Sequence, residues 1–239
     1  MNDIIAEIAK VIDTDDISEE REYFLFHENR FIEIFSILQK FERNKKVLDI
    51  SSASLHVPLG AHFMGFKDLH ATDISFSGKA LIDRAARFGI ALKDCDLEKE
   101  ELPFSDSTFD IVLLTETLEH FNFHPGKAMS EISRVLAPEG VVIITTPNLV
   151  RLNNRIKMLI GKSINYDIKE KYHPGIHFRE YTAQEICYLL DSADIKTDQV
   201  IFADFKYPGR GLVEASVNRL LGKFFSSLKN NVIVIGKKK

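Results

Sequence analysis

The sequence has few cysteines and no long apolar run, and each shortage excludes a class of protein. Among 239 residues only Cys95 and Cys187 are cysteines, and no CxxC pair or Cys/His cluster at metal-binding spacing occurs. We therefore expect two buried, reduced thiols, no disulfide framework and no metal ion. No stretch approaches the ~18 apolar residues of a membrane helix, so no membrane span is expected.

A basic excess is also missing. Lysine and arginine number 31 against 35 aspartates and glutamates, and the net charge of -4 excludes the usual electrostatic footprint of a nucleic-acid-binding protein. The lysines at 237–239 are the one like-charge run, and we expect them to be solvated. Because the first residues are acidic and lack the basic start of a secretory signal, a cytoplasmic protein is expected.

Helical and apolar segments alternate along the chain, which indicates an α/β protein. The first 45 residues carry two helical patterns, one over 4–12 and one from Ser18 to about Phe41, and they predict an N-terminal helical cap. Short apolar, β-branched runs then predict strands at 47–51, 68–72, 90–95, 109–115, 141–147, 195–204 and 231–236. Amphipathic segments predict helices at 58–64, 77–89, 125–140, 149–160, 182–192 and 211–225. This alternation is typical of a mainly parallel sheet covered on both faces, and the last two strands suggest an antiparallel edge.

Three aspartates fall at or near the carboxyl ends of predicted strands, where open parallel sheets bind ligands. Asp49 lies in the first strand–loop unit, Asp73 ends the second strand and Asp96 follows the third. Asp73 lies about 22 residues beyond the first loop, the spacing at which a carboxylate binds the ribose of an adenosine cofactor. A single aspartate after a strand is more often a helix cap or turn former, but three in succession favour a cofactor site.

The stretches DLEKEELPFSDSTFDIVLLTETLEHF (96–121) and EISRVLAPEGVVIITTPN (131–148) resemble class I S-adenosylmethionine-dependent methyltransferases of the quinone, sugar and small-molecule type. The likeness covers about residues 45–205 and is strongest between 96 and 148. It implies a Rossmann-like, doubly wound, seven-stranded sheet, mostly parallel with an antiparallel last strand. We expect one methyltransferase domain over 1–239, with the cap at 1–45, the core at 46–239 and a lid loop at 161–181.

The resemblance implies a role for several residues around S-adenosylmethionine. Asp73 would bind the ribose, Asp96 and Leu97 would flank the adenine, and Thr115 and Glu116 would line the methionine side. HENRF (27–31) is similar to an H-x-x-R-[YF] element of some relatives, in which Arg30 would neutralise the cofactor carboxylate; a solvated helix residue is the alternative. The expected cofactor-binding residues are Arg30, Asp49, Ser51, Ser52, Ala53, Asp73, Ile74, Asp96, Leu97, Thr115 and Glu116.

The first loop departs from the family pattern D-x-G-x-G-x-G. Its three glycine positions are Ser51, Ala53 and Leu55. Glycine allows a tight turn and a close approach of the ligand, so serine and alanine are expected to weaken binding. For Leu55 two alternatives stand open: its side chain occupies the place of the cofactor, or the loop has shifted and Gly60 or the backbone of the next helix serves instead.

The acceptor side of the site is expected after the fourth and fifth strands. His120 would act there as a general base, and its alternative is a hydrogen-bonded structural histidine. Residues 164–182 are similar to an H-[IVF]-x-F-[FY]-T segment of the same methyltransferases, against the alternative of a solvent-facing polar loop. The expected substrate-binding residues are Asn148, His173, His177, Arg179 and Tyr181.

These observations predict an S-adenosylmethionine-dependent methyltransferase that acts on a small-molecule or sugar-type acceptor. A methyltransferase fold that serves as a binding or scaffold module is the first alternative, because of the missing glycines. A nicotinamide-dependent oxidoreductase is the second, since Asp73 would suit either cofactor. LPFSDSTFD and the lack of a Tyr-x-x-x-Lys pair argue against the oxidoreductase. The acceptor atom and the oligomeric state stay open.

Overall fold

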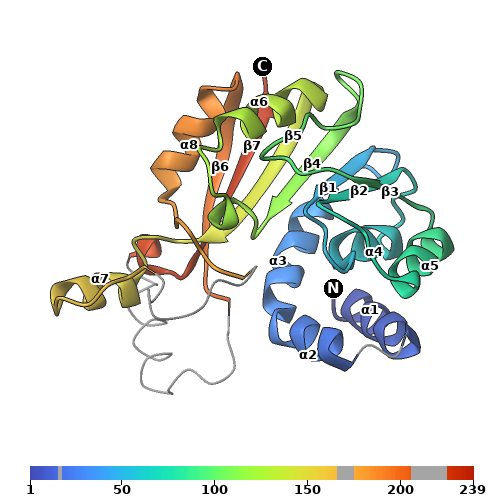
Figure 1. Cartoon of the computed structure of the whole chain (residues 1–239), viewed down its shortest axis with the longest axis horizontal. Coiled ribbons are helices and arrows are strands. Elements are labelled where there is room, and N and C mark those ends of the chain that lie inside the picture. The colour runs from blue at the N-terminus through green and yellow to red at the C-terminus, as the bar shows by residue number, and fades with distance from the viewer. Residues whose placement is uncertain (16–17, 166–174, 206–224) are drawn as a thin grey trace.

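The computed structural model describes residues 1–15, 18–165, 175–205 and 225–239. Its centre is a seven-stranded sheet in the order β3-β2-β1-β4-β5-β7-β6 (Figure 1). The strands are β1 (Val47–Ile50), β2 (Leu69–Asp73), β3 (Ile90–Asp94), β4 (Phe109–Thr115), β5 (Leu136–Pro147), β6 (Ile195–Ala203) and β7 (Asn231–Lys238). The helices are α1 (Asn2–Asp15), α2 (Ser18–Phe26), α3 (Glu28–Leu38), α4 (His56–Phe63), α5 (Lys79–Phe88), α6 (Gly126–Val135), α7 (Leu152–Leu159) and α8 (Ala183–Asp191), with 3₁₀ turns η1 (Leu118–His120) and η2 (Ser226–Leu228).

The strand directions match the fold class that the sequence predicts. Strands β1 to β5 pair in parallel, and β7 runs antiparallel to both of its neighbours, β5 and β6. The strand order reverses between β1 and β4, because the chain first builds outward from β1 to β3 and then returns to the other side of β1. The carboxyl ends of β1, β2 and β4 therefore meet at the topological switch point, where open α/β sheets bind ligands.

Strand β4 shows how the sheet separates two hydrophobic cores. Ile111 and Leu113 belong to the cluster formed with the N-terminal helices and α4, whereas Val112 and Leu114 belong to the cluster formed with α6 and α8. Alternate residues of a strand point to opposite faces, and both faces are covered, so all four side chains are fully buried. This explains why residues 111–114 of the strand are an unbroken apolar run.

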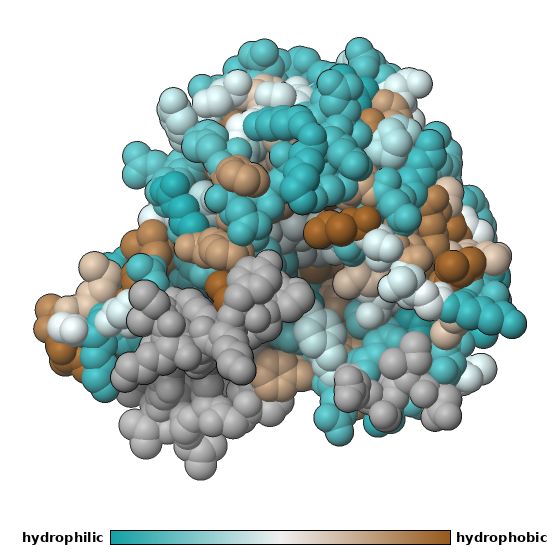
Figure 2. Space-filling view, in the orientation of Figure 1, coloured by the Kyte–Doolittle hydropathy of each residue, from teal (hydrophilic) through white to brown (hydrophobic). Residues whose placement is uncertain are grey.

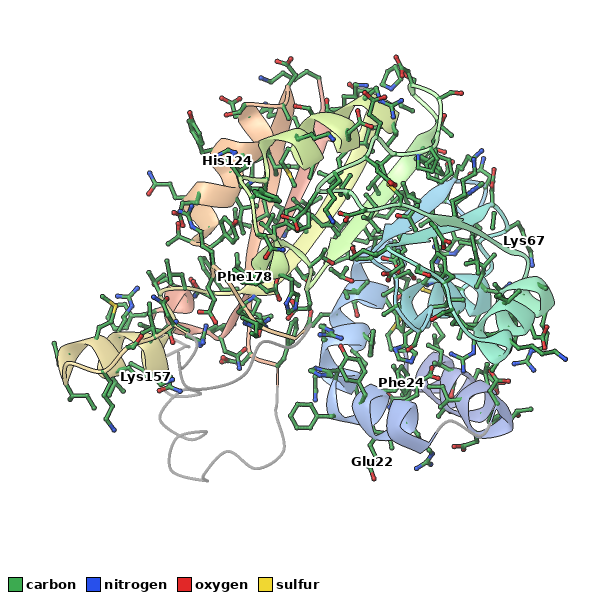
Figure 3. The ribbon with its side chains drawn as sticks, in the orientation of Figure 1. Glu22, Phe24, Lys67, His124, Lys157 and Phe178 are labelled. Carbon is green, nitrogen blue, oxygen red and sulfur yellow. The ribbon has the colours of Figure 1, made fainter. Side chains whose placement is uncertain are left out.

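The N-terminal cap differs from the expected single helix over 18–41. The chain leaves helical geometry at His27, whose φ of -100° and ψ of 11° separate α2 from α3. The His27 ring packs on Tyr23 and Phe26, with ring centroids 4.4 and 4.9 Å away. The break lets α2 and α3 face the core separately, and Figure 3 shows Phe24 turned into the cap while Glu22 points outward.

A second correction concerns the predicted helix over 125–140. Helix α6 ends at Val135 and β5 begins at Leu136, which pairs with Phe109 of β4. Pro138 prevents a continued helix because it has no backbone N–H to donate. Apart from β5, which begins five residues before its predicted start, the ends of the remaining predicted helices and strands lie within three residues of those observed. The helix predicted at 211–225 lies almost wholly outside the described residues.

Helix α7 projects from the sheet and exposes apolar side chains. Ile156, Met158 and Leu159 are exposed, as is Ile160 just beyond the helix, and Figure 2 shows brown, hydrophobic atoms at that end of the molecule. Helix α7 has 8 residues, and no helix of the described part of the chain is long and apolar enough to span a membrane. Both cysteines are free; Cys95 is buried as expected, whereas Cys187 is only partly buried.

Candidate functional site

The loop after β1 has the backbone shape that glycines would allow, although it contains none. Ser51, Ala53 and Leu55 have φ values of 57°, 45° and 65°, all in the left-handed region. Left-handed backbone is the conformation for which glycine is ordinarily used. The three positions at which the sequence departs from the D-x-G-x-G-x-G pattern are therefore the three that have left-handed backbone in this loop.

The first alternative for Leu55 does not hold. Its side chain is fully buried in the hydrophobic core next to Val57 and Leu59, so it does not occupy the binding edge of the sheet. The loop has also not shifted to use Gly60. A Cβ at Gly60 would lie 2.1 Å from the ring of Phe35, so this glycine allows α3 to pack closely against α4.

Two aspartates accept hydrogen bonds from residues of the loop after β1 and from Ile74. The Asp73 carboxylate accepts hydrogen bonds from the backbone N–H groups of Ala53 and Ile74, both at 2.7 Å. The Asp49 carboxylate accepts one from the Ser52 hydroxyl at 2.6 Å. Burial raises the pKa of Asp49 to about 7; the Asp73 charge adds to the rise and the Ser52 hydrogen bond opposes it. The predicted residues Asp49, Ser52, Ala53, Asp73 and Ile74 thus come together, although the Ile74 side chain itself is exposed.

Glu116 and Arg30 meet at the carboxyl end of β4. Glu116 follows Thr115 directly, has a φ of 50°, and accepts a hydrogen bond from Thr145 of β5 at 2.9 Å. Arg30 reaches it from α3, with 3.8 Å between Nη1 and Oε2. Arg30 is 6% exposed, so the alternative of a solvated helix residue is wrong. The cap therefore contributes a buried cation to the sheet edge.

Asp96 and Leu97 lie in the loop after β3. The backbone N–H of Cys95 donates to the carbonyl of Asp73 at 2.7 Å, which ties this loop to the end of β2. The Asp96 carboxylate accepts hydrogen bonds from Lys99 Nζ at 2.6 Å and from the backbone of Glu98 at 3.2 Å. Leu97 is buried. The expected adenine-flanking pair is thus placed beside the expected ribose-binding carboxylate.

His120 lies on η1, at the end of the sheet toward which β4 and β5 run. Its Nδ1 lies 2.8 Å from the carbonyl oxygen of Ile176, and its ring centroid is 4.9 Å from that of His177. Burial lowers the pKa of His120, with the nearby His177 as a further cause and the Ile176 hydrogen bond opposing it. Figure 3 shows Phe178, which follows His177 in the chain, at this end of the sheet. The structure thus brings together two histidines predicted on separate grounds.

The other predicted acceptor-side residues divide into three groups. Asn148 is fully buried, and its amide donates to the carbonyls of Ser227 and Lys229 at 2.8 Å, which shows a structural role. Arg179 and Tyr181 line a different pocket from His177, on the α8 side. His173 lies outside the described residues. The pocket beside His177 has a volume of about 250 Å³ and is lined by Leu149, Ile164, Asn165, Gly175, His177, Phe178 and Glu180.

Several polar side chains that form hydrogen bonds at this site were not predicted from the sequence. Tyr23 accepts a hydrogen bond from Arg30 at 3.0 Å, and Asn231 of β7 donates to Glu116 at 3.3 Å. Glu119 is 1% exposed and is held by Thr146 at 2.8 Å. Glu119 adjoins His120 in the LEHF stretch, so its position in the motif was a usable signal; the others depend on contacts between distant segments.

Comparison with known proteins finds methyltransferases among the similar sequences and structures. Residues 48–144 match a family model described as a methyltransferase domain. The chain is 32% identical over 118 residues to an uncharacterized protein of Methanocaldococcus jannaschii, covering 49% of this chain and 48% of that protein. It is 30% identical over 114 residues to a probable S-adenosylmethionine-dependent methyltransferase of Mycolicibacterium smegmatis, covering 48% and 38%. The chain thus spans less than half the length of these curated relatives.

A solved structure matches nearly the whole chain. It is a methyltransferase of Thermotoga maritima, titled as a possible histamine N-methyltransferase, with a TM-score of 0.62 at 16% identity, covering 97% of this chain and 100% of that one. The fold is therefore that of the class I methyltransferases, as the sequence predicts. Within it, residues 48–144 are the part that matches the methyltransferase domain model.

Proposed function

We propose that this protein transfers a methyl group from S-adenosylmethionine to a hydroxyl of a small-molecule or sugar-type acceptor. The observation that carries the proposal is the left-handed backbone at Ser51, Ala53 and Leu55 directly beside Asp73. Left-handed backbone costs about 1–2 kcal/mol at each non-glycine residue, and here it gives the tight turn beside Asp73 that the glycine motif is used for.

The charges at the sheet edge fit the two ends of the cofactor. Asp73 supplies carboxylate oxygens for the ribose hydroxyls, while Asp96 and Leu97 are available for the adenine amine and ring. At the opposite end, Arg30 supplies a positive charge for the cofactor carboxylate and Glu116 a negative charge for its amine. Leu55 would contribute only its backbone. The proposed cofactor-binding residues are Arg30, Asp49, Ser51, Ser52, Ala53, Asp73, Ile74, Asp96, Leu97, Thr115 and Glu116.

His120 lies where the acceptor would meet the methyl group. Methyl transfer is an in-line displacement: the carbon–sulfur bond breaks as the carbon–oxygen bond forms, and the acceptor loses its proton. A carbonyl oxygen only accepts hydrogen bonds, so the contact with Ile176 puts the proton of a neutral His120 on Nδ1 and leaves Nε2 as the acceptor. Nε2 is thus the atom that would take the proton, directly or through a water.

The acceptor itself would enter through the pocket beside His177. Its lining combines apolar side chains with His177, Asn165 and Glu180, which suits a molecule with both apolar and polar parts. Arg179 and Tyr181 line the neighbouring pocket and are proposed as contacts for an extended acceptor. The acceptor class is therefore proposed from the residues that line this pocket.

Calorimetric titration with S-adenosylhomocysteine and with NAD tests the cofactor assignment. We expect heat and 1:1 binding with S-adenosylhomocysteine and none with NAD at the same concentration. Absence of heat with S-adenosylhomocysteine at millimolar concentration would reject the enzyme and favour the scaffold alternative, and heat with NAD alone would favour the oxidoreductase.

A pair of variants makes the test specific for the site. Asp73→Asn removes the negative charge that would accept the ribose hydroxyls, so we expect at least a tenfold weaker affinity, about 1.4 kcal/mol. Asp68→Asn is the matched control, because Asp68 begins the β2 region, is exposed and contacts Lys46 and His70. Equal affinities of the two variants would place the cofactor elsewhere.

A further inference from the structure

A carboxylate and two imidazoles converge at the acceptor end of the site. Glu119, His120 and His177 each offer one potential ligand atom, and these three atoms all lie within 4.8 Å of one another. Glu119 and His120 are neighbours on η1, whereas His177 comes from a segment that docks onto them. The backbone N–H of Phe178 donates to the Glu119 carbonyl at 2.8 Å and fixes that segment in place.

Both imidazoles are oriented through Nδ1, which leaves Nε2 for another partner. His120 Nδ1 donates to the Ile176 carbonyl at 2.8 Å. His177 Nδ1 lies 3.6 Å from Glu180 Oε1, and Glu180 is itself held by Arg151 and Asn154. Metal-binding histidines characteristically donate their second ring N–H to a carbonyl or carboxylate, which fixes the tautomer and the ring orientation.

The Glu119 carboxyl group provides independent support for a bound ligand, because one of its oxygens is buried without a hydrogen-bond partner. Its side chain is 1% exposed, and Oε2 accepts a hydrogen bond from Thr146 at 2.8 Å. Oε1 is buried and has no hydrogen-bond partner. A buried polar oxygen without a hydrogen-bond partner is unfavourable in a folded protein. A cation beside it would remove that cost.

We propose that Glu119, His120 and His177 bind a divalent transition-metal ion such as Zn²⁺, Co²⁺ or Mn²⁺. A set with two imidazoles favours these ions over Mg²⁺ and Ca²⁺, which prefer oxygen ligands. Ligands of a tetrahedral zinc ion lie about 3.4 Å apart, given bond lengths of about 2.1 Å. The three ligand atoms would have to move closer to one another by up to about 1.4 Å, and the side chain of His177, which comes from a separate segment, is 40% exposed.

A metal ion at this site would have a role in the proposed methyl transfer, and that role rests on the proposed function. Three protein ligands leave a coordination position open for the acceptor hydroxyl, and binding to the ion lowers the pKa of that hydroxyl. The proton then leaves to solvent, the methyl carbon passes from the sulfonium sulfur to the acceptor oxygen, and S-adenosylhomocysteine remains. His120 would serve in this step as a ligand of the ion rather than as the base.

Metal binding to the full chain without a polyhistidine tag tests the site independently of activity. We expect one Zn²⁺ per chain by calorimetry and a visible Co²⁺ absorption band typical of nitrogen and oxygen ligands. His177→Ala should weaken both by at least tenfold. His124→Ala is the control, because His124 is also an exposed histidine of this half of the protein but lies outside the cluster. Mg²⁺ should bind at least tenfold more weakly than Zn²⁺.

A second variant separates lost ligands from a damaged fold. Glu119→Gln keeps the size of the side chain and an acceptor for Thr146, so the fold should persist in circular dichroism while Zn²⁺ binding falls at least tenfold. No Zn²⁺ or Co²⁺ binding at submillimolar concentration, or equal loss in His177→Ala and His124→Ala, would overturn the site. S-adenosylhomocysteine binding, measured on the same samples without metal, reports on the proposed function separately.

Discussion

At the scale of single residues, the loop after β1 shows how left-handed backbone is retained without glycine. Each non-glycine residue in this region costs about 1–2 kcal/mol. Two hydrogen bonds offset part of that cost, from Ala53 N–H to Asp73 at 2.7 Å and from Leu55 N–H to the Ser52 carbonyl at 2.9 Å. Burial of the Leu55 side chain offsets more. The three positions are therefore equivalent in backbone but not in side chain.

This difference predicts opposite effects of glycine at Ala53 and at Leu55. Ala53 is exposed, so Ala53→Gly relieves strain without loss of packing and should raise the free energy of unfolding by about 0.5–1 kcal/mol. Leu55→Gly relieves the same strain but removes a fully buried side chain, and should lower it by about 2 kcal/mol or more. Urea denaturation at pH 7 measures both. The same sign for the two variants would contradict this account of the loop.

Asp49 predicts a dependence of stability on pH. Burial raises the pKa of Asp49 to about 7 in the folded protein, against an ordinary value of 3.8, with the Asp73 charge adding and the Ser52 hydrogen bond and Arg30 opposing. A raised carboxyl pKa stabilises the folded state fully below about pH 4, and this contribution is lost as the pH rises to about 7. At about 1.4 kcal/mol per pKa unit, the loss is at most about 4 kcal/mol.

Asp49→Asn should remove that dependence while its amide oxygen still accepts from Ser52. We expect the variant to gain free energy of unfolding relative to the wild type between pH 5 and pH 8, in urea titrations at both values. Asp68→Asn, at an exposed aspartate, is the control and should follow the wild type. A constant difference between Asp49→Asn and the wild type across this range would show that Asp49 does not titrate there.

At the scale of elements, one buried cation of α5 joins the N-terminal cap to the core. The Arg84 side chain is fully buried; it donates to Asp15 of α1 at 2.6 Å, to Glu20 of α2 and to the Ser54 carbonyl at 2.9 Å. Glu20 also contacts His56 of α4 at 2.9 Å. The hydrogen bonds from His56 and Arg84 lower the pKa of Glu20 despite its burial, which alone would raise it.

Removing this cation should cost much more than removing its exposed neighbour. Arg84→Ala removes the buried cation that Asp15 and Glu20 share, and loss of one member of a buried ion pair costs about 3–5 kcal/mol. Arg87→Ala removes a side chain that is 43% exposed and pairs with Asp15 at 3.0 Å, so we expect a loss below about 1 kcal/mol. Urea denaturation of both variants measures their losses in free energy of unfolding. Similar losses would show that Arg84 does not join the cap to the core.

The elements themselves were largely predictable because the sheet is buried on both faces. Strands such as β4 read as continuous apolar runs, and FDIVLLT matches the observed strand at both ends. The break at His27 was not predictable, because strong helix formers lie on both sides of it. The start of β5 at Leu136 was missed because its pairing with Phe109 is a long-range contact that local periodicity does not contain.

The candidate site was predictable only in part, for the same reason. Asp73 and Glu116 follow strands, so chain order alone placed them at the binding edge. The approach of His177 to Glu119 depends on a segment far along the chain that docks through the Phe178 N–H. Cysteine and histidine spacing therefore predicted no metal ion, while the folded chain brings one potential ligand atom each of Glu119, His120 and His177 within 4.8 Å of one another.

At the scale of the whole molecule, the last strand lies inside the sheet rather than at its edge. Strand β7 pairs with β5 on one side and β6 on the other, and the residues from Asn231 to Gly236 are all buried. Ile233 and Ile235 face one core, and Val232 and Val234 face the other. The final residues therefore complete both cores, and Asn231 also reaches Glu116 at the binding edge.

This position predicts that folding is cooperative across the chain and depends on β7. Deletion of residues 231–239 would leave β5 and β6 as unpaired, apolar edges, so we expect a chain that aggregates and shows no cooperative urea transition. Deletion of Lys239 alone should cost little, because its side chain is 51% exposed and its ion pair with Asp191 lies at the surface. Circular dichroism and urea denaturation of both truncations test this. A cooperative transition without β7 would mean that β1 to β5 and their helices form an independent folding unit, and S-adenosylhomocysteine binding by that truncated chain would then show whether Asn231 is needed for the site.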